Sequence, residues 1–332
     1  MRKIKIAQIG TSGASHGRMI FDSLKKQNDI FDIAGYVLCE NEREKFPDAV
    51  KSFDGYKELS LNEVLNNPEI EAVTVETEEI YLTKYASLCA KNKKHIHMEK
   101  PGGMNLPDFE ALIDTVKKNN TVFHTGYMYR YNPCIQQLLR QAKNGELGEI
   151  IGIEAQMDCI HPFETRKWLE TFKDGGMMFF LGCHLIDLIL QFQGIPEKIH
   201  SFNKASGIDG LSSKDFCMAV FEYKNGVSFV KTVATELGGY ARRQFVINGT
   251  KKTVELKPFE MTEDDMIYTG KTEYTSEIWA DMGTYTKSAL FDRYDNMMSS
   301  FAAMVRGEKE NPWNYDYELM LYKTIHKICN MA

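Results

Sequence analysis

The sequence lacks the marks of several protein classes. Its seven cysteines are scattered over 332 residues and never take the CxxC spacing of zinc and redox sites. Basic residues are not in excess, because 40 Lys and Arg stand against 46 Asp and Glu, a net charge of −6. A surface that binds nucleic acid or an anionic membrane needs the opposite balance. We therefore expect reduced thiols, no metal site, and neither nucleic acid nor a membrane as partner.

Long apolar runs are also scarce. The window 175–195 raises the question of a membrane span, but it contains His184, Asp187 and two glutamines. The basic start of the chain has no apolar core behind it, since Gln8 and Gly10 interrupt the pattern of a signal peptide. We interpret the window as a buried helix with its lead-in and expect a cytoplasmic protein.

What remains is the composition of a folded protein with a sizeable core. Hydrophobic residues make up 43% of the chain and charged residues 26%. At roughly 150 residues per domain, this length predicts about two domains.

The first third alternates β-rich runs with helical patterns, which is typical of βαβ units and a parallel sheet. The patterns predict strands at 5–10, 32–38, 71–76, 95–98 and 122–125, and helices at 15–26, 80–91 and 106–119. The fold class expected for residues 1–125 is therefore α/β, with a doubly wound parallel sheet.

From about residue 149 strand-like runs follow one another with little helix between them. They cover 150–157, 198–203, 216–223, 227–235 and 243–247, and Asn248-Gly249 predicts a hairpin into 252–256. Consecutive strands with tight turns favour an open, mostly antiparallel sheet. Helical patterns at 285–305 and 316–329 complete an α+β domain expected over residues 126–332.

A glycine-rich segment joins the first predicted strand to the first helix. Gly10, Gly13 and Gly17 lie in it, so backbone amides can face a pyrophosphate at the positive end of the helix. The spacing is not a strict G-x-G-x-x-G, and a merely tight turn is the alternative. The expected dinucleotide-binding residues here are Gly10, Thr11, Ser12, Gly13, Ser15 and His16.

The end of the second strand bears on the choice of dinucleotide. Glu40 is placed to bind an adenosine ribose 2′-hydroxyl and to repel a 2′-phosphate, although a solvated helix start is an equally good interpretation. Arg43, one turn further, could instead pair with a 2′-phosphate. NAD is thus only weakly favoured over NADP.

Glu99-Lys100-Pro101 follows the strand at 95–98. Ligands of doubly wound sheets bind at the carboxyl ends of strands, so Lys100 would project towards a nicotinamide. Its ammonium could then bind a substrate hydroxyl and stabilise a developing alkoxide. Taken alone, an exposed Glu-Lys pair is more often simply solvated.

Together the motifs resemble the Gfo/Idh/MocA family of nicotinamide-dependent sugar and cyclitol oxidoreductases. The resemblance runs nearly end to end: the glycine loop, Glu99-Lys100-Pro101, the stretches 126–133 and 145–150, Gly175-Gly176, and 181–187. It implies an N-terminal Rossmann domain that binds NAD or NADP, and a C-terminal sheet that mediates homodimers or homotetramers. It also implies that Lys100 lies beside both substrate and nicotinamide, that Thr77, Glu99 and Pro101 adjoin the cofactor, and that the bond into Pro101 is cis.

The chain departs from the family pattern at the substrate site. Phe180 stands four residues before His184, where relatives carry an aspartate. Leu82 and Glu78 also replace a common histidine and a common proline. A histidine suits the role of base, so Lys100 and His184 remain as the expected catalytic pair. His184 as a satisfied buried histidine is the alternative, and Asp187 could orient its ring.

Candidates for binding a polyhydroxylated substrate combine aromatic rings with polar tips. They are Tyr127, Tyr129, Arg130, His161, Lys167, Trp168 and His184, and Phe179 and Phe180 would add apolar area. The leading hypothesis is an NAD(P)-dependent dehydrogenase acting on a sugar, cyclitol or related hydroxy compound. The alternatives are an NAD-dependent glycoside hydrolase or lyase of the same superfamily, and a cofactor-binding sensor with little turnover.

Overall fold

The computed structural model describes residues 2–331. Its contacts divide the chain into two compact units, Met1–Met128 with Tyr294–Tyr322, and Tyr129–Arg293 with Lys323–Ala332. The first unit therefore also contains a segment from the end of the chain.

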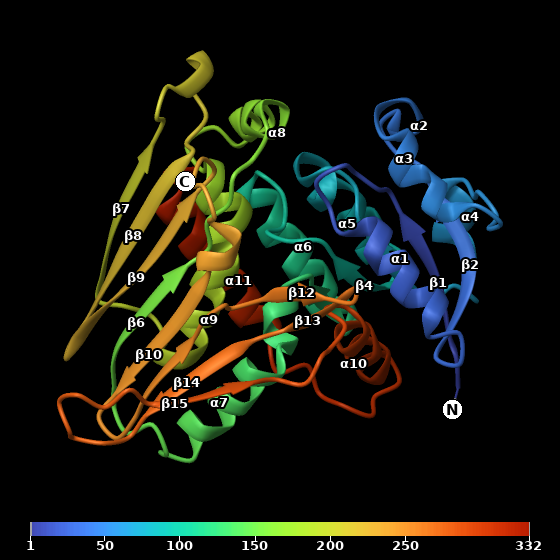
Figure 1. Cartoon of the computed structure of the whole chain (residues 1–332). Helices are drawn as coiled ribbons and strands as arrows, with labels where there is room; N and C mark the ends of the chain where they lie inside the picture. Colours follow the sequence, from blue (N-terminus) through green and yellow to red (C-terminus); the bar gives the residue numbers. More distant parts are fainter. Residues whose placement is uncertain (1, 332) are drawn as a thin grey trace. The chain divides into compact units, whose positions relative to one another are not determined.

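A five-stranded parallel sheet forms the centre of the first unit (Figure 1). Its strands are β1 (Ile4–Ile9), β2 (Phe31–Val37), β3 (Ala72–Val75), β4 (His95–Met98) and β5 (Phe123–Thr125). Their order in the sheet is β2-β1-β3-β4-β5, which confirms the doubly wound topology. The strand order changes direction between β1 and β3, so their carboxyl ends form the expected binding crevice.

Helices of the first unit pack in pairs. Helix α1 (Gly17–Lys26) packs on α10 (Asp295–Val305), and α5 (Leu82–Lys91) packs on α6 (Leu106–Asn119). Helix α6 begins where the Asn105 side chain accepts a hydrogen bond from the Asp108 amide at 3.1 Å. The remaining short elements are α2 (Glu42–Lys45), α3 (Pro47–Val50), η1 (Lys51–Phe53), α4 (Leu61–Asn66) and η2 (Glu79–Tyr81).

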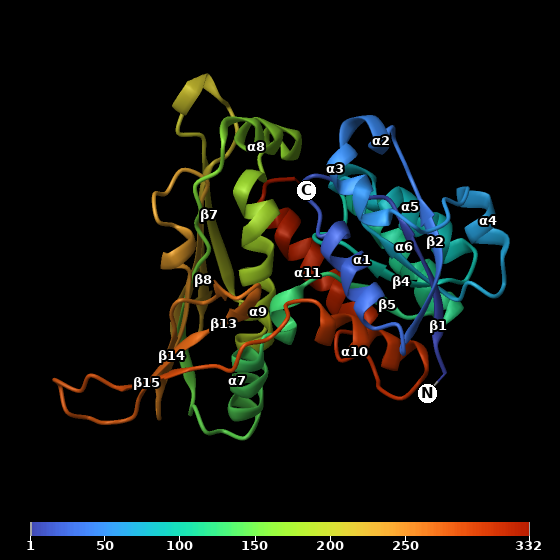
Figure 2. The ribbon, with the colours of Figure 1, turned by 45° about the vertical axis from the view of Figure 1, so that its right-hand side comes forward.

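An eight-stranded sheet dominates the second unit, in the order β15-β14-β11-β10-β6-β9-β8-β7. The strands are β6 (Ile150–Gln156), β7 (Lys198–Lys204), β8 (Phe216–Tyr223), β9 (Gly226–Val233), β10 (Gln244–Gly249), β11 (Thr253–Leu256), β14 (Gly270–Tyr274) and β15 (Thr284–Lys287). Only β6 and β9 pair in parallel, so the expected mostly antiparallel sheet is confirmed. Helices α7 (Pro133–Lys143) and α9 (Cys183–Gln193) lie on one side of this sheet, and no helix label stands on its other side in Figure 2.

Several shorter elements complete the described chain. They are η3 (Met128–Tyr131), α8 (Phe163–Trp168), η4 (Leu169–Phe172), η5 (Met178–Gly182), η6 (Ile208–Gly210), η7 (Tyr240–Arg242), the two-stranded β12 (Met261–Glu263) and β13 (Met266–Tyr268), and α11 (Tyr315–Ile328).

Two expectations for the C-terminal half need correction. The helix expected at 285–305 begins only at Asp295, because Thr284–Lys287 pairs with β14 as β15. The hairpin after Asn248 is confirmed, but Asn248 still pairs with Thr253, so the turn lies at 249–252.

The expectations for the thiols and for the apolar window agree with the structure. All seven cysteines are buried, and none is joined to another by a disulfide. The window 175–195 holds α9 and its lead-in. Among residues 2–331, no helix is both long and apolar enough to cross a membrane.

Candidate active site

The glycine loop lies at the crevice between the ends of β1 and β3. Gly10 has φ of +81°, and a Cβ added there would lie 2.6 Å from the Cβ of Thr77. Only glycine fits both the dihedral angle and the close approach. A side chain at Gly10 would therefore disturb the fold itself, besides blocking a phosphate.

The serines that replace glycines in this loop hold its shape. Ser12 Oγ accepts hydrogen bonds from the amides of Ala14 and Ser15 at 3.3 and 2.8 Å. Ser15 Oγ in turn accepts from the amides of Ser12 and Gly17 at 3.1 and 3.2 Å. Thr11 Oγ1 is buried, and no other described residue hydrogen-bonds to it. The loop is therefore preformed, and the Thr11 hydroxyl remains available as a hydrogen-bond donor. Both features fit the phosphates of a dinucleotide.

Two acids follow β2, and they differ in environment. Glu40 accepts hydrogen bonds from Lys84 and from Tyr85 Oη, and these bonds hold the pKa of its carboxyl below the ordinary value. Glu42 is fully buried, its Oε2 accepts the Cys39 amide at 2.7 Å, and its Oε1 would lie 2.9 Å from a Cβ on Gly10. Burial raises the pKa of Glu42 to about 7. Sequence reasoning missed Glu42, although its place in the first turn after β2 was a usable signal.

Glu99 and Lys100 are buried, with 2% and 1% of their surfaces exposed, so they are not a solvated pair. Glu99 Oε2 accepts the His16 amide at 2.9 Å and lies 2.7 Å from His16 Nδ1. Burial acts to raise the pKa of Glu99, but His16 and the charge of Lys100 outweigh it and lower that pKa to about 2. The peptide bond between Lys100 and Pro101 is cis, as expected. The strand end thus fixes the backbone of Lys100 beside an ionised carboxylate.

In the second unit, His184 lies in the first turn of α9 with 1% of its surface exposed. The π-helical turn η5, which contains Phe180, leads directly into α9. The ring of Tyr129 meets that of His184 edge-on at 5.0 Å between centroids. Tyr129 Oη donates to Glu260 at 2.6 Å, and Arg243 and Arg293 also bind this carboxylate. The imidazole of His184 therefore packs against a hydrogen-bonded, charged network.

Arg130 and Asp187 form a buried ion pair in the same unit. Arg130 Nε and Nη2 donate to Asp187 Oδ2 and Oδ1 at 3.0 and 2.8 Å, and Gln191 donates to Oδ2 at 2.9 Å. Bidentate pairing of this kind fixes both side chains. The ion pair joins η3 to α9. Arg130 therefore has a structural role besides the substrate binding that the sequence predicts for it.

Aromatic side chains occupy the region of Phe180. The Trp168 ring packs edge-on against Phe180 at 5.1 Å, and the His161 ring lies 6.1 Å from Phe180. Burial, reinforced by the Arg243 charge, lowers the pKa of His161 to about 4, so His161 is neutral at pH 7. Lys167, by contrast, is exposed. Phe180, at the position where the resemblance implies an aspartate, is thus surrounded by rings and by a neutral histidine.

The predicted site residues fall into two groups. The first unit holds all those expected for the cofactor, together with Lys100 and the buried Tyr127. The second unit holds Tyr129, Arg130, His161, Lys167, Trp168, Phe180 and His184. Within it Tyr129 touches His184, and Phe180 touches Trp168. The pairing of Lys100 with His184 joins residues of different units and stays a prediction.

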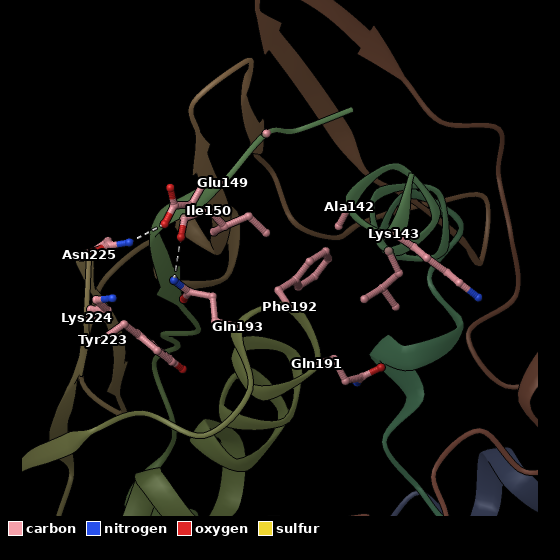
Figure 3. A pocket seen from close by; sticks show the side chains of 13 residues that line it. Ala142, Lys143, Glu149, Ile150, Gln191, Phe192, Gln193, Tyr223, Lys224 and Asn225 are labelled. Atoms are coloured by element: carbon pink, nitrogen blue, oxygen red, sulfur yellow. Dashed lines mark hydrogen bonds between the residues drawn. The ribbon is translucent and has the colours of Figure 1, made fainter. Parts of the chain in front are cut away.

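A pocket of about 510 Å³ opens at the far end of α9 (Figure 3). Phe192 lies between the side chains of α7 and those of the β8–β9 turn, and Glu149 and Asn225 hydrogen-bond at one rim. Gln191 in its lining stands two helical turns after His184, about 10 Å along the axis. None of the predicted site residues lines this pocket.

Comparison with known proteins places the chain in a family. Residues 4–127 match the model of an oxidoreductase family with an NAD-binding Rossmann fold, and residues 135–255 match the GFO/IDH/MocA C-terminal domain. An uncharacterized oxidoreductase of Rhizobium meliloti, ORF334, is 26% identical over 82% of this chain and 81% of its own length. Myo-inositol 2-dehydrogenase of Thermotoga maritima is 27% identical over 58% of this chain and 54% of its own length.

Solved structures show the same fold at low sequence identity. Aldose-aldose oxidoreductase from Caulobacter crescentus matches with a TM-score of 0.80 at 16% identity, covering 100% of this chain and 98% of that one. Because the glycine loop, the buried Lys100 and both family models agree, the chain belongs to the Gfo/Idh/MocA family and is an NAD(P)-dependent oxidoreductase.

Proposed function

We propose that the protein is a dehydrogenase that transfers hydride between nicotinamide and a secondary alcohol of a sugar, cyclitol or related hydroxy compound. The observation that carries the proposal is Lys100, buried at the carboxyl edge of the parallel sheet beside the ionised Glu99. A lysine so placed serves a reacting oxygen better than it serves stability, because burying a charge is costly. The inositol dehydrogenase among the relatives supports this substrate class.

The division of labour follows from the residues. When bound, the nicotinamide supplies the hydride acceptor. The loop from Gly10 to His16 holds the phosphates with backbone amides at the start of α1. Lys100 donates a hydrogen bond to the substrate oxygen and stabilises negative charge there. His184, a residue of the second unit, stays the predicted base for the hydroxyl proton. The hydroxyl proton leaves through one of these two groups.

We infer that NAD is the preferred cofactor. Glu40 follows β2, and Lys84 and Tyr85 hold its pKa below the ordinary value, so an ionised carboxylate there disfavours a 2′-phosphate. Arg43, the alternative phosphate partner, is paired with Glu58. Calorimetric titration with NAD and NADP tests this preference.

Phe180 favours considering two alternative functions, because it stands where the family resemblance implies an aspartate. A glycoside hydrolase or lyase would form product without net reduction of the cofactor, and a sensor would form none. A panel of polyols, sugars and glycosides, followed at 340 nm and by product analysis, separates the three.

Lys100→Met is the decisive variant for the dehydrogenase. We expect kcat to fall by roughly 100-fold or more while cofactor affinity changes little, because the lost interaction strengthens in the transition state. An unchanged kcat on the substrate that the panel identifies would move the chemistry away from Lys100.

We also propose that the protein forms homo-oligomers through the open face of the eight-stranded sheet. Phe202, Phe216 and Val227 are 52%, 44% and 55% exposed there. Pairing of β7 with β8 and of β8 with β9 sets all three on one face. Apolar area of this kind is typical of an interface.

A further inference from the structure

A second pocket, of about 570 Å³, lies at the amino-terminal edge of the parallel sheet in the first unit. His95 begins β4 and Phe123 begins β5, and both residues line this pocket. Ligands of doubly wound sheets bind at the opposite, carboxyl edge, where the glycine loop and Lys100 follow their strands. Met98 at the end of β4 is roughly 10 Å from His95 along the strand. The pocket is therefore distinct from the cofactor crevice.

Hydrogen bonds hold the far wall of the pocket in place. This wall is the connection from α10 to α11, which packs beside the start of β5. Asn311 Nδ2 donates a hydrogen bond to the carbonyl oxygen of Phe123 at 2.8 Å. Tyr315 Oη donates to the carbonyl oxygen of Thr121 at 2.8 Å. Both bonds tie the connection to the backbone at the sheet edge, so the pocket is preformed.

Arg306 supplies a buried positive charge to the lining. It follows the last residue of α10, and 6% of its side chain is exposed. Its Nε donates a hydrogen bond to Glu308 Oε1 at 2.8 Å. Its Nη1 is buried, and no other residue in the described part of the chain hydrogen-bonds to it. Because an unbonded guanidinium N–H at this depth is costly, Arg306 calls for an acceptor from outside the chain.

Two further residues of the lining offer N–H donors. The Val122 amide donates to His95 Nδ1 at 3.0 Å, so the neutral ring of His95 carries its proton on Nε2. Burial lowers the pKa of His95 and thereby favours this neutral ring. Lys309 Nζ donates to Ser300 Oγ at 2.9 Å and keeps two more N–H groups. N–H donors of arginine, histidine and lysine in one pocket are typical of a site for an oxyanion.

The charge of the lining favours one kind of oxyanion. Arg306 and Lys309 are positive and Glu310 is negative, which leaves a net charge of +1. Glu308 lies outside the lining and its side chain is 45% exposed, so water screens its charge. A carboxylate, with one negative charge, balances the lining, whereas a dianionic phosphate exceeds its charge.

The apolar part of the lining defines the rest of the ligand. Phe123, Met304 and Val305 are buried there, and a pocket of this volume holds a small organic molecule. We propose that the pocket binds a small monocarboxylic acid with an aliphatic or aromatic body, and that Arg306 binds its carboxylate. Because the cofactor crevice lies at the opposite edge of the sheet, the acid and the dinucleotide bind at the same time.

The first test is a calorimetric titration of the cofactor-free protein with 3-phenylpropionate and with its uncharged isostere, 3-phenylpropionamide. One molecule of the acid should bind per chain, at least about 10-fold more tightly than the amide, because only the acid forms a charge-assisted bond with Arg306. Acetate, which lacks the apolar body, and inorganic phosphate should both bind more weakly than the acid. No binding of the acid at millimolar concentration, equal affinities for acid and amide, or phosphate as tight as the acid would overturn the proposal.

The second test uses variants of the pocket. Arg306→Gln should weaken binding of the acid by about 10-fold or more and leave binding of the amide unchanged. Lys309→Gln changes an exposed residue and should weaken binding of the acid by about 3-fold. Arg140→Gln removes an exposed positive charge from α7 in the second unit and is the control that should keep wild-type affinity. Wild-type affinity in Arg306→Gln, or in Lys309→Gln where Arg306→Gln does not fold, would refute the site.

The third test locates the bound acid. In ring ¹⁵N spectra, 3-phenylpropionate should shift the Nε2 signal of His95, which His95→Gln identifies by its loss. Calorimetric titration with NAD at a saturating concentration of the acid should give the same affinity as without it. An unmoved His95 signal, or competition between the acid and NAD, would place the acid elsewhere. None of these tests measures turnover, so the site stands or falls independently of the proposed dehydrogenase.

Discussion

At the scale of single residues, several acids near the carboxyl edge of the parallel sheet are buried rather than solvated. Glu42, Glu76 and Glu79 are all nearly or fully buried, and burial raises the pKa of each. The positions of Glu76 and Glu79 give no hint of this burial, because a glutamate after a strand is usually solvated. Lys100 and the cis bond into Pro101 were predictable, since they belong to a motif rather than to an environment.

Glu79 provides a test of this burial that is independent of catalysis. Burial raises its pKa to about 7, although the Lys100 charge opposes the shift. Between the ordinary carboxyl pKa and that value, the folded state binds a proton that the unfolded state has lost. Stability attributable to Glu79 is therefore present below this window and is lost as pH rises through it. Glu79→Gln removes the loss, so we expect it to be more stable than wild type at pH 8 by up to about 3 kcal/mol.

Urea unfolding of both proteins at pH 4 and pH 8 measures the effect. The difference in unfolding free energy should be near zero at pH 4 and should favour Glu79→Gln at pH 8. An equal difference at both pH values would show that folding leaves the pKa of Glu79 unchanged and that the burial argument is wrong.

At the scale of elements, local pattern identified most strands, and long-range pairing decided the rest. The five strands of the first sheet and the hairpin from β10 to β11 follow from alternation and turn residues. Strand β15 could not be foreseen, because Thr284–Lys287 becomes a strand only by pairing with β14. The π-helical form of η5 was equally hidden, since no residue pattern marks it.

Phe180 in the turn η5 is expected to influence which substrate the protein prefers. Phe180 packs on Trp168 and lies near the neutral His161, so an aspartate there would meet an apolar wall. We expect Phe180→Asp to change the order of kcat/KM values across a panel of polyols and sugars by about 10-fold or more. The maximum rate on the native substrate should change less, because Lys100 and His184 remain. Phe180→Leu is the matched control for lost ring packing. Activity that arises only in Phe180→Asp would support the sensor.

At the scale of the whole molecule, the chain does not divide at one point. By their contacts, residues 294–322 belong to the first unit, and the described residues from 323 onward belong to the second. The helical patterns at the end of the chain do not predict this division. Amphipathic periodicity shows that one face of a helix is buried, but it does not show which part of the protein covers that face. The sequence pattern also does not predict the oligomeric interface, because that interface depends on which face of a sheet no helix covers.

The open face of the eight-stranded sheet predicts the oligomeric state. Phe202 and Phe216 lie on neighbouring strands β7 and β8, on the face that the helices of the second unit leave bare (Figure 2). Two half-exposed phenylalanines on one face are typical of a surface that a second copy of the chain covers. In a symmetric dimer both rings of each copy would be buried. Charges there should repel a second copy without harming the core, because neither ring is buried in the chain itself.

We expect Phe202→Glu/Phe216→Glu to be monomeric by light scattering, with an unchanged circular dichroism spectrum. Met19→Glu, on α1 of the first unit and 37% exposed, is the control for an apolar surface residue outside the eight-stranded sheet and should keep the wild-type mass. A wild-type protein that is already monomeric at micromolar concentration, or a double variant that still assembles, would place any interface elsewhere.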